Sequence, residues 1–97
     1  GMRMNEPALD LPLVMAIVSS LRDKNLDDNT VIFGEVGLAG EVRAVNMAQL
    51  RVREAKKLGF KTCILPGSSL RKLDKDRLAD MNMIGVDSIR EAVNLIK

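Results

Sequence analysis

Few residues of this 97-residue sequence carry side chains that do chemistry. The chain contains no histidine, so the commonest general base and the commonest metal ligand are both missing. Its one cysteine, Cys63, excludes a disulfide and a cysteine-based zinc site, and the strand-like K-T-C-I-L around it predicts a buried, unreactive thiol. Ser19 and Ser20 lie in an apolar run and should be structural, whereas Ser68 and Ser69 follow a Pro-Gly turn and should be solvated. We therefore expect no cofactor site and no metal site in this chain.

Basic side chains are concentrated at residues 51–61, where Glu54 is the only acidic residue among them. Three of them follow the spacing i, i+3, i+4 and would share one helix face. Such a face contacts DNA phosphates, contacts acidic groups of a neighbouring subunit, or is an ordinary solvated surface. The formal net charge of +2 is too small to imply nucleic-acid binding, and with two aromatic residues in the chain we expect no base stacking. The candidates for DNA or subunit contact are Arg43, Arg51, Arg53, Lys56 and Lys57.

The elements that position these residues centre on residues 31–66, which predict a strand, a tight turn, a second strand, a helix and a third strand. Two glycines three positions apart in the turn, G-L-A-G, favour a hairpin or a bulged corner. Asn46 is the expected N-cap of a helix over residues 47–58, and Gly59 is its expected C-cap. The third strand should cover residues 61–65 and stop at Pro66-Gly67.

The flanking segments predict a strand and a helix before this unit. Residues 2–7 alternate apolar and polar side chains, as in a short edge strand. Residues 10–22 are apolar almost all round and predict the most buried helix of the domain, with Asp10 as its cap. The core side chains of this helix should be Val14, Ile17, Val18 and Leu21.

The end of the chain predicts a loop with a weak helix, then a strand and a final helix. The strand should cover residues 83–86, and Ser88 with Glu91 should form a capping box on a helix over residues 89–97. The leucines and the methionine of residues 70–81 have partial helical spacing and should pack on the core. The order β-α-β-β-α-β-(α)-β-α predicts a single α/β domain over residues 1–97, a sandwich with a mixed sheet packed with helices.

The strand–turn–strand F-G-E-V-G-L-A-G-E-V-R of residues 33–43 resembles a family pattern of Lon-protease-type domains, G-E-[IV]-x-L-x-G-x-V. Together with V-S-S-L-R-D at residues 18–23, it is most similar to the C-terminal Lon-like domain of RadA-type bacterial DNA repair and recombination proteins. The resemblance implies a Lon-protease-like fold of the S5 domain 2 type. It also implies that the chain is the C-terminal piece of a longer protein.

Lon-type proteases use a Ser–Lys dyad, and the resemblance identifies the corresponding positions here. The family serine lies in a P-S-A-G turn before a helix ending A-L-V-S-A-L, which matches A-I-V-S-S-L and places Ala8 at the serine position. The family lysine lies in G-G-L-K-E-K, which matches N-M-A-Q-L-R and places Arg51 at the lysine position. Alanine has no nucleophilic oxygen, and arginine stays protonated and cannot act as a general base. The resemblance therefore implies the fold and argues against the activity.

The resemblance also implies a setting for the domain. In RadA-type proteins it is associated with a hexameric ring and DNA binding, in a DNA-dependent ATPase that drives branch migration. ATP and zinc would bind domains absent from this chain, and we expect a cytoplasmic protein with no membrane contact. One alternative is a fragment of a working Lon-type Ser–Lys ATP-dependent protease, which Ala8 and Arg51 argue against. Another is the Lon-like domain of magnesium-chelatase-related ATPases, which share a D-L-P helix entry with residues 10–12.

Overall fold

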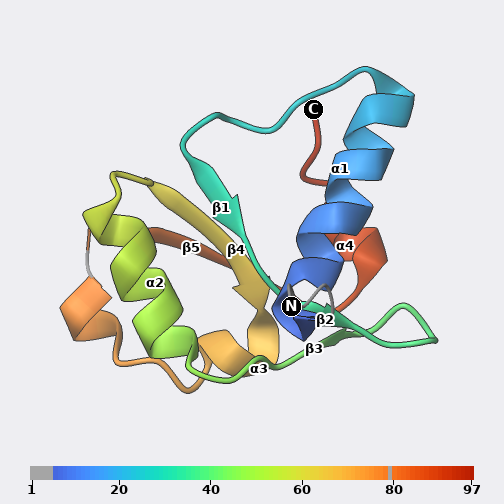
Figure 1. Ribbon diagram of the computed structural model, residues 1–97. Helices are drawn as coiled ribbons and strands as arrows, with labels where there is room; N and C mark the ends of the chain where they lie inside the picture. Colours follow the sequence, from blue (N-terminus) through green and yellow to red (C-terminus); the bar gives the residue numbers. More distant parts are fainter. Residues whose placement is uncertain (1–5, 79) are drawn as a thin grey trace, which may run out of the picture.

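The structure, a computed structural model, describes residues 6–78 and 80–97 and contains two small sheets with helices around them (Figure 1). The edge strand predicted at residues 2–7 falls mainly outside the described residues, and Pro7 begins a 3₁₀ turn. In chain order the elements are η1 (Pro7–Leu9), α1 (Asp10–Arg22), β1 (Thr30–Ile32), β2 (Glu35–Val36), β3 (Val42–Arg43), α2 (Ala48–Lys57), β4 (Thr62–Pro66), α3 (Gly67–Leu70), η2 (Lys75–Leu78), β5 (Asn82–Val86) and α4 (Ile89–Val93).

The larger sheet is parallel, with the strand order β1-β4-β5. Side chains of the central strand β4 alternate between two core clusters, as the period of a strand requires. Cys63 and Leu65 belong to the cluster that α2 joins, whereas Ile64 belongs to the one that α1 and α4 join. The prediction of one mixed sheet is therefore wrong in one respect. The antiparallel pairing occurs in a separate sheet, formed by β2 and β3.

The chain changes sheets at a corner between β1 and β2, which splits the strand predicted from residue 31 onward. At this corner the Gly34 N–H donates to the Ala8 carbonyl (2.9 Å), and the Gly34 carbonyl accepts from the Leu11 N–H (3.0 Å). A Cβ at Gly34 would lie 3.1 Å from side-chain atoms of Leu11 and Val42, so any larger residue would have to displace these side chains by a few tenths of an ångström. The predicted hairpin follows, and Gly40 in its loop has φ +84°.

The helix bounds agree with the sequence better than the caps do. Helix α1 covers the predicted residues, but Asp10 is not its cap, because its carboxylate accepts from the Val36 N–H (3.1 Å). Helix α2 begins after Met47, which adopts φ 57° in the N-cap position where Asn46 was expected. Gly59 follows α2 with φ +95°, as predicted.

The C-terminal elements follow the predicted order with shorter helices. The Ser88 hydroxyl accepts from the Glu91 N–H (3.1 Å), which confirms the half of the predicted capping box that the serine side chain forms. The Glu91 carboxylate accepts from the Asp87 N–H (3.2 Å), and α4 ends at Val93. The predicted packing of residues 70–81 is confirmed, since Leu78 and Met81 are buried and the two other leucines pack against the same cluster.

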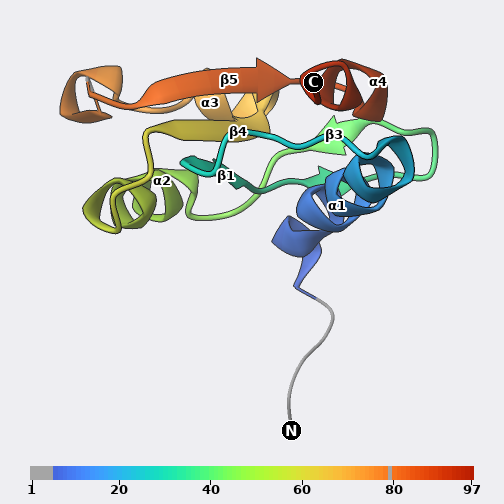
Figure 2. The same cartoon turned by 90° about the horizontal axis from the view of Figure 1, so that it is seen from above.

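The prediction that α1 is the most buried helix is wrong. Leu11 and Met15 are its buried side chains, and they pack with the cluster around Ile64. The helix lies at the side of the molecule, so its opposite face is open (Figures 1 and 2). Of the expected core residues, Ile17 is 60% exposed and Leu21 is 82% exposed, while Val14 and Val18 are half-buried.

Cys63 lies in β4 with no exposed surface, as predicted. Burial raises the pKa of its thiol from an ordinary value of 9.0 to about 12, because a thiolate would lose its hydration there. The neutral thiol is the stable form in the folded chain, and only the thiolate is a good nucleophile.

A leucine pair on α1 tests the assignment of its two faces. Leu11→Ala should lower the free energy of unfolding by about 2–5 kcal/mol, because it leaves a cavity in the core. Leu13→Ala, the same change on the face that is open, should stay within about 0.5 kcal/mol of wild type. Urea unfolding of the two variants measures both values, and equal losses would mean that the helix is buried on both faces.

The buried thiol predicts a loss of stability in alkaline solution. Since the thiol ionises near pH 9 when unfolded and near pH 12 when folded, its contribution is complete below pH 9 and falls as the pH rises above it. Urea unfolding between pH 8 and pH 11 should show a steeper decline for wild type than for Cys63→Ala. Rapid reaction of the folded protein with a thiol reagent at pH 8 would contradict this burial.

Candidate functional site

The start of α1 and the connection from β3 to α2 surround a cavity of about 270 Å³. Ala8 lies at its inner side, 2% exposed, and is held by the backbone bonds to the Gly34 corner. Two carboxylates, Glu6 and Glu35, also line the cavity. The remaining lining residues are Pro7, Ala44, Val45 and Asn46, so the lining offers carboxylates and an amide but no hydroxyl or amine side chain.

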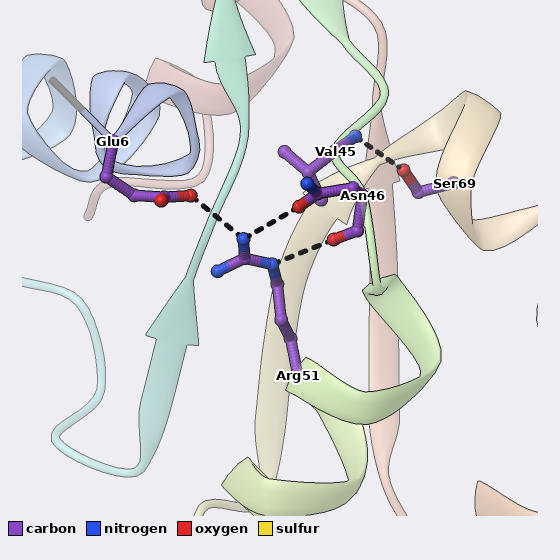
Figure 3. A network of polar contacts seen from close by, with 5 residues as sticks. All are labelled: Glu6, Val45, Asn46, Arg51 and Ser69. Carbon is purple, nitrogen blue, oxygen red and sulfur yellow. Dashed lines mark hydrogen bonds and ion pairs between the residues drawn. The ribbon is translucent and has the colours of Figure 1, made fainter.

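Arg51, in the first turns of α2, joins the two sides of this region (Figure 3). Its Nε donates to the Asn46 carbonyl (2.9 Å), and its Nη2 donates to the Asn46 side-chain Oδ1 (3.0 Å). The same Nη2 forms an ion pair with the Glu6 carboxylate at 2.8 Å. The guanidinium therefore ties the segment before α1 to the segment before α2.

The connection from β3 to α2 is fixed from its other side by Ser69 (Figure 3). The Ser69 hydroxyl accepts from the Val45 N–H at 3.2 Å, and the residue is 4% exposed. The prediction of a solvated loop is therefore wrong for Ser69, because residues 67–70 form the short helix α3 that packs against β5. Ser19, expected to be structural, donates its hydroxyl to the Lys24 carbonyl beyond the end of α1.

Ala8 and Arg51 come together in space, although 43 positions separate them in the sequence. Both line a second groove, of about 280 Å³, between η1 and α2 beside β1. At this place Ala8 presents a methyl group, and Arg51 presents a cation already bonded to acceptors. Sequence reasoning did not find Glu6 or the role of Asn46, because ion pairs across 45 residues leave no local pattern.

The basic candidates do not form one cluster. Arg43 lies on β3 and pairs with Glu41 at 3.2 Å, whereas Arg53, Lys56 and Lys57 lie together on α2. The sequence indicated Glu54 as the one acidic residue near these side chains, and Glu54 does pair with Lys57 at 3.6 Å. Lys56 pairs with Asp80 at 3.7 Å, and Arg53 is exposed with no ion pair to another described residue.

Two negative findings concern the described part of the chain. Across residues 6–78 and 80–97, no group of three or more histidine, cysteine, aspartate or glutamate side chains is arranged to hold a metal ion. None of the helices in the same residues is long and apolar enough to cross a membrane.

Comparison with known proteins shows two relationships. Residues 1–69 match the family model described as subunit ChlI of Mg-chelatase. Nearly the whole chain aligns with DNA repair protein RadA of three bacteria: 44% identity over 96 residues in Aquifex aeolicus, 43% over 93 residues in Bacillus subtilis and 41% over 95 residues in Escherichia coli.

These alignments cover 99%, 96% and 98% of the chain but 20% of each relative, so the chain spans about a fifth of the length of the curated relatives it matches. The fold agrees with this relationship, as a mixed α/β domain with a parallel three-stranded sheet and packed helices. The chain thus belongs to the ChlI family, and throughout its length it is homologous to a region of the bacterial DNA repair protein RadA.

Proposed function

We propose that the chain is the non-catalytic, Lon-like C-terminal domain of a RadA-type DNA repair protein of the bacterial cytoplasm, serving hexamer assembly and DNA binding. The observation that carries the proposal is the pair at the dyad positions. Ala8 and Arg51 face the same groove, where a Ser–Lys protease would need a hydroxyl and a neutral amine.

The bonding of Arg51 supports a structural replacement for the catalytic lysine. A lysine acts as a base only when its surroundings favour the neutral amine. Here the position holds a guanidinium with the Glu6 carboxylate at 2.8 Å, which favours positive charge. In place of a catalytic lysine, Arg51 thus forms an ion pair that ties the segment before α1 to α2.

The alternative of a magnesium-chelatase-related ATPase draws on the family match over residues 1–69. The RadA relatives support a domain of a DNA repair protein more strongly than the family match supports a chelatase-related ATPase. Their alignments extend through β5 and α4 and cover at least 96% of the chain. ATP and zinc would then bind other parts of the protein, and the ATPase that drives branch migration would reside there.

For DNA binding, the most suitable side chains are those on α2. Arg53 and Lys57 are exposed, and Arg53 has no ion pair within the described residues. Arg43 and Arg51 are less suitable, because Glu41 and Glu6 already neutralise them at 3.2 Å and 2.8 Å. A few exposed cations give weak binding in one copy, whereas a ring would repeat the α2 surface in every subunit.

The non-catalytic assignment predicts that the domain hydrolyses neither casein nor short peptides. A fluorophosphonate probe, which labels activated serines, should label none of its serines, because within the described residues no serine bonds to Arg51 or lines the groove that Arg51 shares with Ala8. Mass spectrometry of the treated protein measures the labelling, with a working Lon protease as the positive control. Stoichiometric labelling of one serine would refute the assignment.

The DNA-binding assignment predicts a change in salt dependence. Replacing both Arg53 and Lys57 by Glu in the full-length protein should weaken duplex binding equally at all sequences. It should also reduce the slope of log K against log salt by about 0.9 for each phosphate that the variant no longer neutralises. Fluorescence anisotropy at several salt concentrations gives the slope, and light scattering of the same variant reports the ring.

The matched control replaces Arg71 and Lys72, exposed basic residues outside α2, by Glu. An intact ring with unchanged DNA affinity and salt slope in the α2 variant would mean that Arg53 and Lys57 contact neither DNA nor a neighbouring subunit. Dissociation of the ring would assign them to subunit contact instead of DNA.

A further inference from the structure

The parallel sheet has an open edge at β1. Residues of a parallel strand face a neighbouring strand alternately, and Phe33 faces β4, since its N–H donates to the Ile64 carbonyl (3.0 Å). The N–H and carbonyl of Ile32, the residue before it, therefore point away from β4. Among the described residues, no backbone hydrogen bond of a turn or loop uses these two groups. The edge thus offers a donor and an acceptor to a further strand.

The groove of about 280 Å³ between η1 and α2 lies along this edge, where β1 passes between α1 and α2 (Figure 1). Three successive residues of the β1 segment line it: Val31, Ile32 and Phe33. Val31 and Phe33 belong to the core cluster on the α2 side, whereas Ile32 belongs to the cluster on the α1 side. An occupant of the groove would therefore meet the edge of the sheet and not one of its faces.

The walls of the groove are apolar and exposed. Leu58, at the end of α2, is 77% exposed, and Leu9, in η1, is 49% exposed. The two charged residues of the lining, Arg51 and Glu54, already form ion pairs within the domain. The groups left without a partner are apolar side chains and the backbone of a strand edge. This combination binds an extended segment, with main-chain hydrogen bonds along the edge and apolar side chains in the groove.

The polypeptide enters the domain at this groove. Ala8 and Leu9 line it, and Glu6, just before them, is held at 2.8 Å by Arg51, another lining residue (Figure 3). In the C-terminal position proposed above, the rest of a RadA-type protein precedes Glu6. Since the chain spans about a fifth of the length of its relatives, most of such a protein would be joined to the domain beside the groove.

This covalent connection favours the protein's own preceding segment over a separate molecule. A segment joined through a short linker is present at an effective concentration of about a millimolar. A separate molecule would lose its translational and rotational freedom on binding, and a single small apolar groove does not offset that loss. The segment that precedes Glu6 is therefore the occupant that the position of the groove favours.

We propose that a segment of the same polypeptide preceding Glu6 pairs with the edge of β1 as a further strand and fills the groove between η1 and α2. The inference rests on the proposed C-terminal position of this chain in a longer protein. Because apolar side chains line the groove on the α1 side and on the α2 side, the segment should be apolar on both of its faces. A strand covered on both faces has a continuous apolar run instead of an alternating pattern.

A photo-crosslinking side chain in the groove tests the occupant in the full-length protein. Leu58→benzoylphenylalanine places the crosslinker at a position that is 77% exposed in the domain. Illumination should join it to a peptide that precedes Glu6, which mass spectrometry identifies. An equal mixture of isotopically light and heavy protein separates crosslinks within one molecule from those between two. The matched control is Leu38→benzoylphenylalanine, at a fully exposed leucine outside the groove, which should not capture that peptide.

Hydrogen exchange of the Ile32 amide gives an independent measurement in the same protein. This N–H should exchange on the order of tenfold more slowly in wild type than in a Leu58→Glu variant, because a charge in the groove displaces the strand to which the amide donates. The Leu38→Glu variant, with the same change outside the groove, should exchange like wild type.

The outcomes separate this strand from the proposed function. Crosslinks to a second copy, crosslinks only to residues 6–97, or no crosslink at all overturn the strand, as does equal exchange of the Ile32 amide in wild type and Leu58→Glu. A protein that captures its own preceding segment but neither binds DNA nor forms a ring keeps the strand and loses the proposed function. A protein that binds DNA as a ring, with Leu58 crosslinked elsewhere, loses the strand alone.

Discussion

The placement of α1 against the two sheets depends on one backbone contact, the pairing of Gly34 with Ala8 and Leu11 at the start of this helix. The Gly34 N–H and carbonyl bond to Ala8 and Leu11 at 2.9 and 3.0 Å, and a side chain at residue 34 would crowd Leu11 and Val42. The contact fixes α1 against the corner at which the chain leaves the parallel sheet. From the same corner the hairpin of β2 and β3 extends outward.

That corner also fixes the wall of the cavity at Ala8. The bond to Gly34 holds Ala8 in place through its main chain, which is independent of the side chain at position 8. Arg51 then bonds to Glu6 and Asn46 across the opening. In the proposed function, the geometry of a protease domain is retained because it is structural, while the groups that would react have been replaced.

The exposed surface of α1 illustrates a limit of composition as a guide to burial. Apolar side chains surround the helix, but Leu11 and Met15 are its buried residues, and Val18 is half-buried against the same cluster. The sheet has three strands, and α1 lies against it with one face while no described element covers the other. A helix that is apolar all round implies that something covers it, but the covering element need not belong to the same chain.

Local sequence was enough to predict the order of the elements from α1 onward, apart from the division between β1 and β2, and also the bounds of α1, the glycine turn of the hairpin, the Ser88 cap and the burial of Cys63. These features depend on local periodicity, on glycine and on short-range hydrogen bonds, all of which are visible within a few residues. The resemblance in residues 33–43 further indicated the RadA relationship that the comparisons show. The division into two sheets, the open face of α1, the burial of Ser69 and the partners of Arg51 emerged only in the folded chain. Each of these depends on residues far apart in the sequence, such as Glu6 with Arg51 or Val45 with Ser69, and such pairs form only when packing brings their elements together.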